Sequence, residues 1–112
     1  MSFSSEALRG HTETIILAFL QKNDSYGYEI LKHINDEGNG RIDIKDATIY
    51  TAVKRMEKDG LIATYWGDGD DGGARRKYYS ITLKGRKYWE EKVEEWRELN
   101  VILNRLIGGE KE

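Results

Sequence analysis

Residues 47–82 decide the fold of this chain: they read ATIYTAVKRMEKDG (47–60), LIATYW (61–66), GDGDDGG (67–73) and ARRKYYSIT (74–82). The first stretch has the apolar spacing of a helix, and the second and fourth are rich in β-branched and aromatic residues, which favour strands. The glycines and aspartates between these strands are typical of a hairpin loop. A short helix followed by a basic hairpin is the layout of a winged helix-turn-helix, whose helix enters the major groove of DNA. The sequence therefore predicts DNA binding.

The helix in this stretch is expected to be capped by Asp46 and to end at Gly60. Its inward positions are apolar, namely Ile49, Ala52, Val53 and Met56. At 100° per residue the opposite face holds Ala47, Thr51, Lys54 and Lys58, flanked by Tyr50 on one side and by Thr48 and Arg55 on the other. Small and hydroxyl side chains suit base edges, and lysines suit phosphates. The residues that we expect to contact DNA from this helix are Thr48, Tyr50, Thr51 and Lys54.

The second strand of the hairpin carries the basic residues expected to hold the DNA backbone, namely Arg75, Arg76 and Lys77. Because side chains alternate along a strand, Arg75 and Lys77 share one face and Arg76 lies on the other. The charge distribution supports this prediction. The formal net charge is only -2, yet residues 75–87 hold six basic residues and no acid, and residues 88–98 hold five glutamates. On charge alone, two ordinary solvated surfaces remain the alternative.

Two helices are expected before the recognition helix. Ser4 or Ser5 caps the first, which ends near Lys22, and its apolar positions are Leu8, Thr12, Ile15, Ile16, Phe19 and Leu20. Asp24 or Ser25 caps the second, and the cluster 38–40 (Gly-Asn-Gly) ends it. Its inward positions are Tyr26, Ile30, Leu31 and Ile34. This second helix is expected to position the recognition helix.

A final helix, capped by Thr82, is expected to run to about Ile107, roughly 39 Å at 1.5 Å per residue. So long a helix extends beyond what a small domain can cover. Its four-three stripe consists of Trp89, Val93, Trp96, Asn100, Leu103 and Ile107, beside a second stripe of Leu99, Ile102 and Leu106. One stripe can pack on the domain while the other needs a partner. We therefore expect a homodimer whose interface includes Trp89, Val93, Trp96, Leu103 and Ile107, with Asn100 fixing the register.

Trp89 and Trp96 lie one heptad apart in this seam. If the seam does not close fully, the two indoles leave an aromatic slot at the dimer axis for a flat apolar ligand. The alternative, which the residues alone favour, is that both indoles fill the interface.

Composition excludes several other classes of protein. A chain of 112 residues suits one compact domain, and without cysteine it has neither disulfides nor thiolate metal sites. No apolar run approaches the roughly 20 residues of a membrane helix, and the N-terminus lacks the regions of a signal peptide, so we expect a cytoplasmic protein without membrane contact. Gly67, Gly69 and Gly72 match a dinucleotide motif, but no helix follows them and aspartates surround them. The same loop lacks the bidentate glutamate of a calcium site. We expect no cofactor and no enzymatic activity.

Several long stretches, in order, resemble the PadR family of bacterial transcriptional regulators, specifically its short members with a single C-terminal helix. They are LRGHTETIIL, SYGYEI, ATIYTAVKRMEKDGLI, YWGD and GGARRKYYSIT, followed by Gly85. The resemblance runs from about Leu8 to Ile107, nearly the whole chain. It implies a dimeric winged-helix repressor that binds double-stranded operator DNA and is released by a small aromatic or multidrug-like effector.

The resemblance also implies the position of the effector site. In short members a tryptophan of the last helix, matched here by Trp96, lines a pore between subunits and stacks on flat ligands. Neighbouring pore positions correspond to Thr14, Leu99 and Asn100. The sequence departs from the family pattern at Ala74, an apparent insertion, in the acidic wing tip, which suits phosphate contact poorly, and in the charges at Glu13 and Lys92, which border the implied pore.

These observations together predict a mainly α, α+β fold: a winged helix-turn-helix over residues 1–81 and a dimerisation helix over residues 82–112. The leading functional prediction is an operator-binding repressor. The alternative is a winged-helix module that senses a ligand or binds a protein without reading DNA itself. A DNA footprint upstream of the chain's own gene distinguishes the two.

Overall fold

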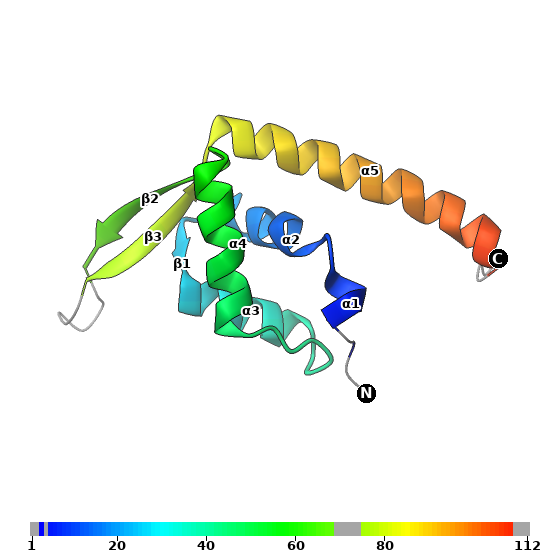
Figure 1. The fold of residues 1–112 in the computed structure, drawn as a ribbon, viewed down its shortest axis with the longest axis horizontal. Coiled ribbons are helices and arrows are strands. Elements are labelled where there is room, and N and C mark those ends of the chain that lie inside the picture. The colour runs from blue at the N-terminus through cyan, green and yellow to red at the C-terminus, as the bar shows by residue number, and fades with distance from the viewer. Residues whose placement is uncertain (1–2, 4, 69–74, 109–112) are drawn as a thin grey trace.

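The chain forms five helices and a three-stranded antiparallel sheet in the computed structural model, which describes residues 3, 5–68 and 75–108 (Figure 1). In chain order the elements are α1 (Ser5–Leu8), α2 (Thr12–Leu20), β1 (Ser25–Tyr26), α3 (Gly27–Glu37), α4 (Asp46–Lys58), β2 (Ile62–Gly67), β3 (Arg76–Ile81) and α5 (Leu83–Ile107). Three packed helices followed by a hairpin and a long helix confirm the predicted α+β winged-helix fold.

The single first helix predicted from the sequence is in fact two helices. Gly10 has a φ of +84°, a left-handed conformation that interrupts a helix, and the amide of His11 bonds to the carbonyl of Leu8 at 2.9 Å. The predicted cap at Ser4 lies outside the described residues. The end of α2 at Leu20 is two residues before the expected one. The turn at Gly10 therefore separates the short helix α1 from α2.

The predicted cap of the second helix is also wrong. Ser25 belongs to strand β1, where it pairs with Tyr79 of β3, and the helix begins only at Gly27. The Ser25 side chain is fully buried and its hydroxyl donates to Glu29 Oε1 at 2.5 Å. A strand of two residues is too short to produce an alternating pattern, so no periodic signal predicts it.

The recognition helix α4 is oriented as predicted, since its four inward side chains all belong to the buried core. Asp46 is the first residue of the helix rather than its cap, and the cap position is Lys45. Gly60, with a φ of +79°, follows the helix and turns the chain into β2. The core gathers side chains from α2, α3, α4 and the base of the sheet, namely Ile16, Leu17, Leu20, Ile30, Ile34, Ile44, Ile49, Ala52, Val53, Met56, Leu61, Ile62 and Tyr79.

The sheet has the strand order β1-β3-β2, so β3 is its central strand. In the hairpin, Thr64 lies opposite Tyr79 and Trp66 opposite Lys77. Residues 69–74 of the wing tip, including the predicted insertion at Ala74, lie outside the described residues. The hairpin extends beside α4, away from the C-terminal end of α5 (Figure 1).

Helix α5 begins and ends as the sequence predicts. The Thr82 hydroxyl accepts a bond from the Gly85 amide at 3.0 Å, and Gly108, with a φ of +81°, closes the helix. The N-terminal half packs on α2, whereas the C-terminal half runs past the rest of the domain and gives the molecule its 53 Å long dimension (Figure 1). Within the described residues, no helix combines the length and the apolar character needed to cross a membrane.

Candidate nucleic-acid interface

The outward face of α4 is the first part of the interface. Thr51 and Lys54, two of the predicted DNA contacts, are exposed there together with Ala47 and Lys58. The four inward residues of the same helix are buried, so the helix is fixed in rotation about its axis. The face left to solvent is therefore hydroxyl and small at its N-terminal end and basic at its C-terminal end, as direct readout with phosphate anchoring requires.

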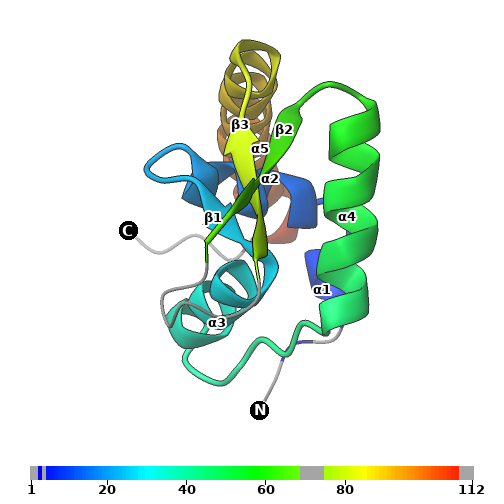
Figure 2. The same cartoon turned by 90° about the vertical axis from the view of Figure 1, so that its left-hand side faces the viewer.

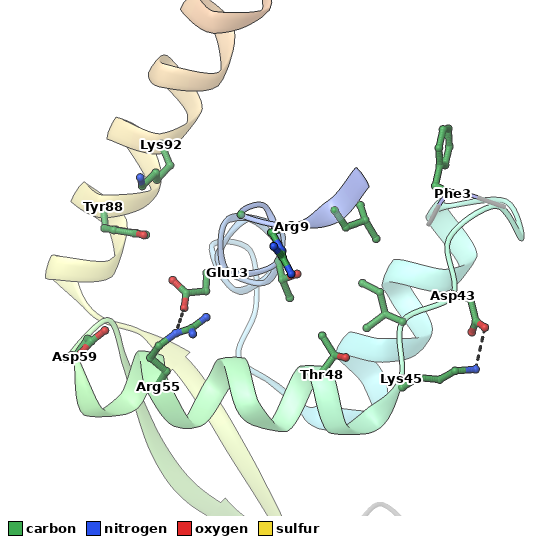
Figure 3. A pocket seen from close by; sticks show the side chains of 14 residues that line it. Phe3, Arg9, Glu13, Asp43, Lys45, Thr48, Arg55, Asp59, Tyr88 and Lys92 are labelled. Atoms are coloured by element: carbon green, nitrogen blue, oxygen red, sulfur yellow. Dashed lines mark hydrogen bonds and ion pairs between the residues drawn. The ribbon is translucent and has the colours of Figure 1, made fainter. Parts of the chain in front are cut away.

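Thr48 and Arg55 lie on the flank of α4 that faces α2, and both line a cleft of about 830 Å³ (Figure 3). Across this cleft Arg55 Nε donates to Glu13 Oε2 of α2 at 2.5 Å. Glu13 is thus directed to the recognition helix. Thr48 remains exposed, but its position on this flank makes it more peripheral than Thr51.

Tyr50 lies on the other flank, toward α3 and the hairpin. It lines a shallow hollow of about 370 Å³ together with Arg76 and Lys77. A Cβ added at Gly27 would be 3.2 Å from the Tyr50 hydroxyl oxygen, so the start of α3 is in close contact with this ring. The structure therefore brings a predicted recognition residue and two predicted backbone contacts to one depression.

The three basic residues of the wing differ in their surroundings. Arg75 is exposed and immediately precedes β3. The Arg76 guanidinium lies 4.6 Å from the ring centroid of Tyr26, on the opposite face of the strand from Lys77. Lys77 Nζ is 3.9 Å from a carboxylate oxygen of Glu57 on α4. Arg76 and Lys77 thus contact different neighbours, and Lys77 is the one held near the predicted recognition helix.

Sequence reasoning missed two residues of this surface, Trp66 and Glu57. Trp66 is 58% exposed and lies opposite Lys77, where the β2 alternation could have located it. Glu57 contacts the hairpin from α4, and no sequence pattern indicates such a contact between elements. An aromatic cluster stiffens the same hairpin, because the Tyr65 and Tyr78 rings stack at 5.5 Å. The bond that the Tyr65 hydroxyl donates to Asp24 raises the pKa of this phenol.

A second site lies at the α2–α5 junction, where a groove of about 440 Å³ opens to solvent. Three of the four predicted effector residues line it, namely Thr14, Trp96 and Leu99. Asn100 is exposed but is not among its lining residues. Glu13 lines only the other cleft, whereas Lys92 lines both and lies 3.6 Å from Glu95. The walls are mainly apolar, as a site for a flat organic molecule requires.

The predicted dimer residues fall into two groups. Trp89 packs against the domain core, and its indole N–H is buried and has no hydrogen-bond partner within the described structure. Val93 is half-buried at the groove. Trp96, Leu103 and Ile107 are exposed to 51%, 37% and 75%. The observed positions of the two indoles therefore do not fit an aromatic slot that uses both, because the Trp89 side chain packs against the domain.

The described residues contain no group of three histidines, aspartates or glutamates able to hold a metal ion. Three of the glutamates, Glu13, Glu29 and Glu57, accept hydrogen bonds from neighbouring side chains and so stabilise the fold.

Comparison with known proteins gives a consistent result. Residues 16–91 match the family model described as the transcriptional regulator PadR-like family. A Lysinibacillus sphaericus protein is 43% identical over 105 residues, which cover 94% of this chain and 95% of that protein. A transcriptional regulator from Clostridium thermocellum is 43% identical with a TM-score of 0.83 and covers 92% of this chain and 96% of that one. A PadR family transcription regulator from Clostridium difficile is 37% identical with a TM-score of 0.78, over 88% and 99% of the two chains. The two solved structures are of transcriptional regulators rather than enzymes, and the chain belongs to the PadR-like family of transcriptional regulators.

Proposed function

We propose that this regulator is a homodimeric repressor that binds operator DNA and is released from it by a flat aromatic or multidrug-like effector. The observation that carries the proposal is the exposed apolar surface of α5, which consists of Trp96, Leu99, Val101, Ile102, Leu103, Leu106 and Ile107. So long a run of apolar side chains on one helix is unfavourable in water and marks a contact surface. A second copy of the same helix would cover it by symmetric packing.

Dimerisation gives the two recognition helices a fixed separation, which two-fold operators require to be about one DNA turn, or 34 Å. In this arrangement Thr51 and Tyr50 contact base edges, Lys54 contacts phosphate, and Thr48 supports the contact from the flank. The DNA backbone beside the wing is held by Arg75, Arg76 and Lys77. Operator binding implies a cytoplasmic site of action.

The effector site of this proposal is the groove beside Trp96. Trp96 is 51% exposed, so a flat ligand can stack on the indole. In a dimer the partner helix approaches the same surface, and Asn100 of both copies then lies near the groove. The ligand acts on DNA binding only if its affinity differs between the DNA-competent and DNA-incompetent spacings of the dimer.

Titration of the purified protein into DNA from upstream of its own gene, at two salt concentrations and against random DNA of equal length, tests the first half of the proposal. A repressor binds the upstream fragment selectively, and its log affinity falls by about 0.9 per phosphate neutralised for each tenfold rise in salt. Equal or absent binding to both fragments points instead to the ligand-sensing or protein-interaction module, or to an operator elsewhere. A genome-wide footprint separates those two outcomes.

The effector half is tested with a panel of flat aromatic dyes added to the protein–operator complex. Binding quenches tryptophan emission and releases the operator in the wild type. Because Trp96 also lies in the proposed dimer surface, Trp96→Ala is compared at a protein concentration that saturates the operator, where it should lose both effects. Glu98→Ala, a change on the same helix outside both the groove and the apolar surface, serves as the control. Release that persists in Trp96→Ala would remove the groove from the mechanism.

A further inference from the structure

Glu57 is an acid on the recognition helix that contacts both strands of the wing. One carboxylate oxygen, Oε2, accepts a bond from Thr64 Oγ1 of β2 at 2.8 Å. The other, Oε1, lies 3.9 Å from Lys77 Nζ of β3. Thr64 and Lys77 are on the same face of the hairpin, because Thr64 pairs with Tyr79 and Trp66 pairs with Lys77. The single carboxylate thus joins three elements.

An acid at this position has an unfavourable effect on DNA binding. Its charge repels the phosphates that Lys54, Lys58 and Lys77 attract, and it partly neutralises Lys77. Nor does the pair add much to folding stability, because the Lys77 and Glu57 side chains are 43% and 41% exposed. Neither attraction to DNA nor folding stability therefore explains the Glu57 contact, so another reason is needed.

The geometry supplies that reason. The hairpin is joined to the domain at its base by Leu61 and Thr82, whose hydroxyl donates to the Gly60 carbonyl at 2.7 Å. Tyr65, whose hydroxyl donates to Asp24 at 2.7 Å, ties the opposite face of β2 to the loop before β1. Glu57 restrains the face toward α4, where the hairpin runs beside the recognition helix (Figure 2). The two ties together restrict rotation of the wing in both directions.

We propose that Glu57 is a positioning residue for DNA binding: it fixes the angle between the recognition helix and the wing, so that both meet one operator at the same time. The inference rests on the proposed function. Its energetic basis is preorganisation, since a wing already held at the binding angle loses less conformational freedom on binding.

The two explanations predict opposite changes in operator affinity for Glu57→Ala, so one substitution distinguishes them. If Glu57 is only a repulsive charge, Glu57→Ala raises affinity for operator and random DNA alike. If it positions the wing, Glu57→Ala raises random-DNA affinity but lowers operator affinity, and the operator-to-random ratio falls about tenfold. Glu57→Gln, which keeps an oxygen acceptor for Thr64, recovers most of that ratio. A parallel gain for both DNAs overturns the proposal.

Two further variants control for charge and for folding. Thr64→Val removes the hydrogen bond without changing charge, and it should lower the operator-to-random ratio by a factor of about three to five. Asp59→Ala removes the same charge at the end of the same helix, where the contact made by Asp59 to Lys84 is through its main-chain carbonyl and survives the change. This control should raise both affinities and leave their ratio unchanged. A Thr64→Val protein with a wild-type ratio also overturns the proposal.

A measurement without DNA separates failure of this inference from failure of the proposed function. Amide hydrogen exchange of residues 62–67 in the free protein should be faster in Glu57→Ala and Thr64→Val than in Asp59→Ala. If the wild type shows no operator preference, the repressor proposal fails. The exchange rates alone then decide whether Glu57 restrains the wing. Equal exchange in all three variants overturns it.

Discussion

The two halves of α5 are a single continuous helix with opposite relations to the rest of the molecule. In the N-terminal half, Gly85 is buried, and Tyr88 and Trp89 pack against the core. In the C-terminal half every described residue from Glu94 onward is exposed, including Leu106 at 77%. Both halves are apolar at helical spacing, so composition does not distinguish them. What differs is whether the chain itself supplies the opposing surface.

This comparison shows how a small domain can carry an assembly surface without loss of its own fold. The core is complete without the C-terminal half of α5, because the buried cluster ends before Trp96. The N-terminal half is anchored to the domain and so fixes the direction of the free C-terminal half. A partner that binds the free half sets the spacing of the two recognition helices. Substitutions in the first half should therefore affect folding, and substitutions in the second should affect assembly.

The largest effect is expected for Gly85→Ala. A Cβ at Gly85 would lie 2.1 Å from the Leu61 carbonyl oxygen and 2.9 Å from Ile81 Cγ1, so the helix must move away from the domain. Helix propensity alone predicts a gain of about 1 kcal/mol for this change, but overpacking predicts a loss of about 3 kcal/mol or more. Urea unfolding measures the sign. Lys87→Ala, on the exposed side of the same turn, is the control and should change the unfolding free energy by less than about 0.5 kcal/mol.

The next effect is expected for Ile102→Asp in the free half. The substitution leaves the core intact, so the unfolding midpoint of the monomer should hardly change. A charge in the proposed dimer interface should raise the dissociation constant of the dimer about 100-fold, or ~2.7 kcal/mol. Sedimentation equilibrium measures this constant, with Glu98→Ala as the control. Unchanged self-association would place the contact between subunits elsewhere.

The same comparison marks what the sequence could predict and what it could not. Periodicity correctly identified the inward stripe of α4 and the Thr82 cap, because both depend on local spacing. It missed β1 and the turn at Gly10, since a two-residue strand and a single left-handed glycine leave no periodic signal. For α5, periodicity listed the apolar positions, but only the packing of the domain reveals that Trp89 faces the core while Trp96 faces solvent.

A smaller effect of opposite sign is expected for Asn100→Leu. A polar residue in a four-three seam costs stability and fixes the register of two helices. The leucine variant should therefore dimerise about tenfold more tightly, ~1.4 kcal/mol, and lose its unique register. Sedimentation equilibrium measures the affinity, and disulfide trapping at paired cysteine substitutions reports the register. Asn104→Leu lies outside both apolar stripes and should leave both readouts unchanged, whereas weaker dimerisation of Asn100→Leu would exclude Asn100 from the seam.

The smallest effect is expected for Trp89→Phe, a substitution in the N-terminal half of α5, which packs on the domain. Truncating a buried tryptophan to alanine usually costs about 3–5 kcal/mol, and Trp89 is half-buried. Its indole N–H is buried without a hydrogen-bond partner among the described residues, which itself costs about 1–3 kcal/mol. Phenylalanine keeps an aromatic ring and removes that donor, so the two changes oppose each other and the net loss should stay below about 1.5 kcal/mol. Urea unfolding measures it, with Trp66→Phe as the exposed control. A loss of 3 kcal/mol or more would mean that the N–H has an acceptor in solution, and an acceptor from a second copy would bring Trp89 back into the subunit interface.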